Sequence, residues 1–74
     1  MNSEFEKARA DELEAVEEAI DAMSDAPDLD SLWEQQRVIR DRLLNALSTL
    51  IDDEEHDDWM DRSNAATRRR EREL

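Results

Sequence analysis

The histidine of the chain lies inside an acidic run, and this stretch has the residue types that come closest to a metal site. Asp53-x-x-His56 places a carboxylate and an imidazole three residues apart, and Asp52 precedes His56 by four residues. Both spacings put the two side chains on one face of a helix. Helical bundles bind metals with such pairs and with glutamates from neighbouring helices. A carboxylate/His metal-binding bundle is therefore one hypothesis, but a solvated acidic surface is the more ordinary interpretation, and we expect no metal and no cofactor.

A second carboxylate spacing occurs twice, as Glu14-x-x-Glu17 and as Glu54-x-x-Asp57. These segments resemble the magnesium-binding pattern of the MazG-like nucleotide pyrophosphohydrolases. The resemblance implies a hydrolase, yet it covers only the two short segments. The basic nucleotide-binding residues of that family have no counterpart here. We expect a protein that is not an enzyme.

Carboxylates dominate the surface that the sequence predicts. The formal net charge of −12 repels phosphate, so direct binding to nucleic acid or to anionic lipid is not expected. The expected acidic surface combines helix-spaced carboxylates of the first half with the acidic run, and its members are Glu14, Glu17, Glu18, Asp21, Asp52, Asp53, Glu54, Glu55, Asp57 and Asp58. The only dense basic stretch, Arg68-Arg69-Arg70-Glu71-Arg72, lies near the end of the sequence.

The elements that carry these side chains are predicted to be helices. The sequence has no glycine and a single proline, Pro27, so it lacks the residues that turns between strands require. Ser3-x-x-Glu6 is a capping-box pattern, and apolar steps of three and four residues follow, which predicts a helix over about residues 4–24. Pro27 marks a tight turn before the next helix.

A seam of three-four apolar steps predicts a longer second helix over about residues 28–56. Ser31-x-x-Glu34 offers a capping box near its start. The apolar pattern lapses in the acidic run, and Ser63 is the expected cap of a short last helix over about residues 64–73. No segment is apolar and long enough to span a membrane, and the first residues lack signal-peptide features, so we expect a cytoplasmic protein.

The predicted fold class is all-α, an antiparallel helical hairpin. Its domain organisation is a hairpin domain over residues 1–61 and an arginine-rich segment over residues 62–74 that is helical or frayed. Two heptad helices joined by a short turn, over roughly residues 5–55, resemble the architecture of the Rop family of plasmid regulators. That resemblance implies a homodimer with a four-helix-bundle-like core, and a small core without cysteine also favours pairing with a second copy. It implies no function, because the face that binds RNA in Rop is acidic here.

Two expectations follow from folding the helices back at the turn. Glu12 and Arg40 lie within the apolar stripes and nearly opposite each other, so they are expected to form a structural ion pair that sets the register. The second helix outlasts the first, which leaves an apolar overhang without an intrachain partner. Exposed apolar clusters mark interfaces, and the predicted partner interface is Leu50, Ile51, Trp59 and Met60.

The leading functional hypothesis is a small acidic protein-protein interaction module without enzymatic activity. Small acidic helical inhibitors of this kind are typical of phages and mobile elements, and some imitate the charge of DNA. The expected partner is a basic nucleic-acid-binding protein, which the chain would regulate or inhibit. The alternative is a helical-hairpin dimer that binds nucleic acid through the arginine-rich end.

Overall fold

The computed structural model describes residues 3–74, which form three α-helices and a 3-10 turn without any strand. The elements are α1 (Ser3–Ala22), η1 (Met23–Asp25), α2 (Leu29–Ala46) and α3 (Asp53–Glu73). The all-α prediction is confirmed, although the bounds of the second and third helices differ from those expected. The molecule is elongated, with principal extents of 46 × 19 × 14 Å.

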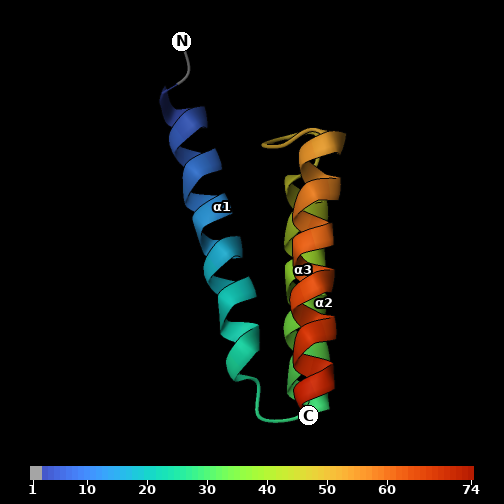
Figure 1. Cartoon of the computed structure of the whole chain (residues 1–74). Coiled ribbons are helices and arrows are strands. Elements are labelled where there is room, and N and C mark those ends of the chain that lie inside the picture. Colours follow the sequence, from blue (N-terminus) through green and yellow to red (C-terminus); the bar gives the residue numbers. More distant parts are fainter. Residues whose placement is uncertain (1–2) are drawn as a thin grey trace.

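The helices lie side by side, with α1 and α3 running in one direction and α2 in the opposite one (Figure 1). α2 and α3 stay together along their lengths, whereas α1 approaches them at its C-terminal end and diverges toward its N-terminus (Figure 1). Burial follows the same division, since α1 contributes a single fully buried residue, Val16. The core lies where the three helices meet and consists of Val16, Met23, Ala26, Leu32, Ile39, Leu43, Ala46 and Ile51.

The turn around Pro27 forms as predicted, but a different residue caps the following helix. Asp28 has an extended backbone and its side chain accepts a hydrogen bond from the Ser31 backbone nitrogen at 2.8 Å. Asp28 is therefore the N-cap, and the expected capping box of Ser31 and Glu34 is wrong. Aspartate and serine both accept such bonds well, so the local pattern alone does not choose between them.

The second helix ends at Ala46, ten residues before its predicted end. Leu47 leaves the helical conformation and Ser48 has a positive φ of 71°, which breaks the hydrogen-bond ladder of the helix. A new helix then starts at Asp53, with Asp52 as its N-cap. The predicted helix over residues 28–56 is thus wrong, because the acidic run begins α3 and does not continue α2.

A complete capping box fixes the start of α3. The Asp52 carboxylate accepts from the Glu55 backbone nitrogen at 2.8 Å, and the Glu55 side chain accepts from the Asp52 backbone nitrogen at 3.3 Å. Asp53 and Glu54 add negative charge to the first turn, where the helix dipole favours it. Part of the acidic run therefore stabilises a helix terminus.

The inward face of α3 mixes polar residues with Trp59, Met60 and Ala66, which explains why no apolar stripe predicted this helix in full. Ser63 and Thr67 are buried, and the Thr67 hydroxyl donates to the Ser63 carbonyl oxygen at 2.9 Å. Ser63 therefore lies in the middle of a helix and does not cap one. The short helix predicted over residues 64–73 is the second half of α3, and the predicted domain boundary after residue 61 falls inside this continuous helix.

Removing the capping box tests the helix break between α2 and α3. We expect Asp52→Ala to lower the free energy of unfolding by about 1 kcal/mol, because the Glu55 backbone nitrogen in the first turn of α3 loses its acceptor. Urea unfolding followed by circular dichroism measures the change. Asp53→Ala is the matched control, since the Asp53 side chain takes no part in the capping box, and it should change stability by a few tenths of a kcal/mol at most. Equal effects of the two substitutions would contradict the observed start of α3.

Candidate functional site

Four carboxylates form an acidic strip on the outer face of α1: Glu14, Glu17, Glu18 and Asp21. Their i, i+3, i+4, i+7 spacing places them on one side of the helix, turned away from the buried Val16. All four are exposed, and none takes part in an ion pair among residues 3–74. The strip is thus a row of charges that forms no ion pair within residues 3–74, although Asp21 lines a groove that also holds arginines.

The density of charge along the strip is close to that of a nucleic-acid strand. Asp21 follows Glu14 by seven residues. At a rise of ~1.5 Å per residue, the mean axial spacing of the four charges is roughly 3.5 Å. Phosphates recur about every 3.4 Å along each strand of B-DNA. The helical backbone makes the row straight and rigid, whereas isolated carboxylates on a loop would not hold this spacing.

The acidic run is a separate patch at the N-terminal end of α3. Arg9 donates to Glu55, and the Thr67 hydroxyl lies 3.5 Å from the Met23 sulfur. These two contacts place the run level with the first half of α1 and the acidic strip level with the middle of α3. Glu55 is half-buried and occupied by Arg9 and by the capping box, while the other carboxylates of the run are exposed, namely Asp52, Asp53, Glu54, Asp57 and Asp58. The structure therefore does not merge the predicted acidic residues into one surface.

The expected ion pair between Glu12 and Arg40 does not form. The guanidinium of Arg42 binds Glu12 instead, with Nε and Nη2 donating to the two carboxylate oxygens at 2.6 and 3.3 Å. The hydrogen bond and the charge of Glu12 raise the pKa of Arg42. Arg40 is exposed on the outer side of α2. The ion pair thus joins Glu12 to the arginine two residues further along α2 than the predicted one.

The predicted overhang has intrachain partners. Ile51 is buried, and Leu50, Trp59 and Met60 are half-buried against the core. The expectation that these four residues lack a partner within the chain is wrong. Because α3 folds back along α2, Trp59 and Met60 of α3 pack against the same core as Leu50 and Ile51. Their assignment to a partner interface therefore loses the observation on which it depended.

The histidine does not assemble a metal site in the structure. Among residues 3–74, no group of three or more His, Cys, Asp or Glu side chains comes together as metal ligands would. The His56 side chain lies on the inward side of α3 with 19% of its area exposed, and its Nδ1 is 3.7 Å from the Asp57 carboxylate. Helix-spaced carboxylates near one imidazole are not sufficient when neighbouring helices contribute no further ligand.

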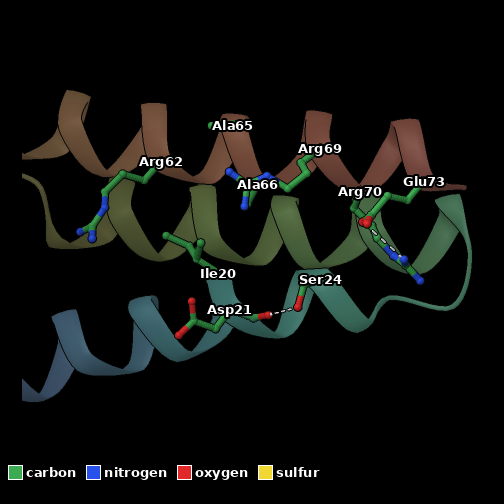
Figure 2. A pocket seen from close by; sticks show the side chains of 9 residues that line it. All are labelled: Ile20, Asp21, Ser24, Arg62, Ala65, Ala66, Arg69, Arg70 and Glu73. Carbon is green, nitrogen blue, oxygen red and sulfur yellow. Dashed lines mark hydrogen bonds and ion pairs between the residues drawn. The ribbon is translucent and has the colours of Figure 1, made fainter.

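A groove between α1 and α3 collects three arginines beside the half-buried Ile20 and Ala66, and the exposed Ala65 also lines it (Figure 2). Arg70 is held by the chain, because its Nε and Nη2 donate to the Ala26 carbonyl oxygen at 3.0 and 2.7 Å.

The other two arginines of the groove differ in how firmly they are held. Arg62 stacks over the Trp59 ring, with its guanidinium carbon 4.4 Å from the ring centroid, an arrangement that stabilises a cation. Arg69 is exposed and forms no hydrogen bond or ion pair with the described residues. Asp21 and Glu73 also line the groove. One free arginine between two carboxylates makes a weak anion site.

Comparisons with protein-family models, with curated proteins and with solved structures find no match for this chain. No helix in the described part of the chain has the length and apolar character needed to cross a membrane. What the fold and the surface define is a three-helix all-α chain with an uncompensated acidic strip.

Proposed function

We propose that this chain is a non-enzymatic interaction module that binds a basic protein surface through the acidic strip of α1 and thereby regulates or inhibits that protein. The observation that carries this proposal is the exposure of four carboxylates in one row without any basic partner in the described chain. Unpaired like charges repel one another and are relieved by a cationic partner. A partner with arginines or lysines along a groove would provide that relief.

The spacing of the strip supports a nucleic-acid-binding protein as the partner. Proteins that bind DNA place lysines and arginines to meet phosphates at a spacing set by the duplex. A rigid row of carboxylates at a similar axial density can occupy the same basic groove and exclude DNA from it. In this proposal the chain is a DNA mimic, and a cytoplasmic protein.

Direct nucleic-acid binding through the arginines of α3 has less support. Arg70 is bound to the Ala26 carbonyl oxygen and lies 3.5 Å from Glu73, while Arg62 covers Trp59. Glu71 and Glu73 interrupt the arginine-rich stretch with negative charge. Phosphate contacts would compete with these interactions and with the net charge of the whole chain.

Neutralising the strip tests the proposal. The tagged full chain and a variant with Glu14→Gln, Glu17→Gln, Glu18→Gln and Asp21→Asn are used to capture proteins from the native host. We expect a basic protein that the wild type retains and the variant loses, because the variant lacks the charges that attract it. The captured protein is then purified, and its binding to the wild type should weaken steeply with salt and be displaced by duplex DNA.

A matched control separates the strip from net charge. Neutralising four exposed carboxylates elsewhere changes the charge equally and should leave capture intact: Asp25→Asn, Asp30→Asn, Glu34→Gln and Asp41→Asn. Loss of binding in both variants would show that only net charge matters. Retention by the strip variant, or binding that is indifferent to salt and to duplex DNA, would refute the proposed function.

A further inference from the structure

The outward face of α3 carries charges of opposite sign at its two ends. In the N-terminal half, the exposed acids follow an i, i+3, i+4, i+7 spacing and are Glu54, Asp57, Asp58 and Asp61. In the C-terminal half the same spacing recurs with one alanine and three arginines, namely Ala65, Arg68, Arg69 and Arg72. In the sequence these two halves belong to different predicted elements, an acidic run and an arginine-rich end, whereas the structure places them on one continuous helix.

Nearly all of these charges are unpaired within the described chain. The ion pairs of α3 use Glu55, Arg70 and Glu73, with His56 beside Asp57. Of these residues, Glu55, His56 and Arg70 are half-buried, and only Asp57 belongs to the outward face. On the outward face, no ion pair among residues 3–74 uses Glu54, Asp58, Asp61, Arg68, Arg69 or Arg72. The face therefore offers acids and arginines that only another molecule can pair.

We propose that this face binds the same face of a second copy, with the two α3 helices antiparallel. A two-fold axis at the level of Ser63 then sets Glu54 opposite Arg72 of the other copy. The acidic half of each helix meets the basic half of the other, so one self-complementary surface pairs three of its four acids with an arginine, and Asp61 faces Ala65.

The angular positions of the side chains agree with this register. At about 100° per residue, Asp57 and Arg68 lie on one flank of the outward face, and Asp58 and Arg69 lie on the other. A two-fold axis that lies between the helices and perpendicular to them brings each flank of one helix beside the same flank of the other. Asp57 thus meets Arg68 of the other copy, Asp58 meets Arg69, and symmetry doubles every pair.

The small side chain of Ala65 lies near the two-fold axis, where it allows the helices to approach. Neighbouring long side chains then reach across the contact. The acidic strip of α1 is not part of this contact, because its charges are on a different helix and turned away from the core. The inference is therefore independent of the proposed function, and a dimer would present two strips.

Charge exchange between two variants tests the pairing. One variant carries Asp57→Arg and Asp58→Arg, and the other carries Arg68→Glu and Arg69→Glu; all four positions lie beyond the first and last turns of α3. Sedimentation equilibrium at physiological salt should show dimerisation of the wild type and at least tenfold weaker association of each variant alone. An equimolar mixture should form a heterodimer at least tenfold tighter than either variant, since both contacts again join opposite charges.

Controls keep the outcome specific to α3. The substitutions Asp30→Arg with Asp41→Arg, and Arg37→Glu with Arg40→Glu, change net charge by the same amounts on α2 and should leave wild-type association unchanged. Circular dichroism establishes that each variant is folded. A wild type that stays monomeric at millimolar concentration, or a mixture that associates no better than its components, would overturn the proposed pairing.

Discussion

Replacing Leu43 by alanine is expected to lower the free energy of unfolding by about 2–5 kcal/mol, whereas Leu44→Ala should change it by less than about 0.5 kcal/mol. The two leucines are neighbours in α2, yet Leu43 is fully buried and 59% of Leu44 is exposed. Truncating Leu43 loses the free energy gained by burying its side chain, and it also leaves a cavity between the helices. Truncating Leu44 changes a side chain that water already contacts.

The size of the expected effect makes it easy to measure. A chain of 74 residues has a typical stability of roughly 4–11 kcal/mol, so the loss expected for Leu43→Ala is a large fraction of the total. Urea unfolding followed by tryptophan fluorescence and circular dichroism, at one protein concentration, gives both values. Comparable losses for the two substitutions would mean that α2 presents a different face to α1 and α3 than the structure indicates.

Deleting residues 65–74 is expected to abolish cooperative unfolding of the whole chain. The deletion removes the buried Thr67 and the two hydrogen bonds from Arg70 to the Ala26 carbonyl oxygen. It also uncovers the part of the core around Met23, which the C-terminal half of α3 covers. A molecule this small has no second core that could compensate for the loss.

Neutralising the exposed arginines is the matched control for that deletion. The substitutions Arg68→Gln, Arg69→Gln and Arg72→Gln keep helix-forming side chains and touch no buried contact. At a protein concentration low enough to keep the chain monomeric, stability should stay within about 0.5 kcal/mol of the wild type. Differential scanning calorimetry distinguishes the two outcomes. A truncated chain that still unfolds cooperatively would show that the arginine-rich end is dispensable for the fold. The neutralised protein is also the proper reagent for any nucleic-acid binding assay, because deletion would remove binding through unfolding alone.

The capping box of α3 is a local signal for the start of a helix, and the longer apolar seam of α2 outweighed it in the prediction. Asp52-x-x-Glu55 has the same form as the Ser3-x-x-Glu6 pattern that predicts the start of α1. It lies inside a dense acidic run, where many carboxylate spacings arise by chance. The apolar seam also continues to Leu50 without interruption. Two short-range signals therefore conflicted, and the longer apolar pattern extended α2 past its true end at Ala46.

Residue types and their spacing were enough to predict an all-helical chain, the turn at Pro27, the start of α1 and the apolar seam of α2 up to Ala46. These features depend on near neighbours in the chain, through backbone propensity, capping and the period of the helix. The acidic strip is of the same kind, because four carboxylates on one helix face need only a helix.

Tertiary packing decided the rest. It paired Glu12 with Arg42, packed Trp59 and Met60 against the core, and buried Ser63 and Thr67 on the same inner face of α3. Such choices depend on which helix covers which, and a polar residue becomes a core residue only when a neighbouring helix approaches it. The same packing turned the acidic run and the arginine-rich end into the two halves of one helix face.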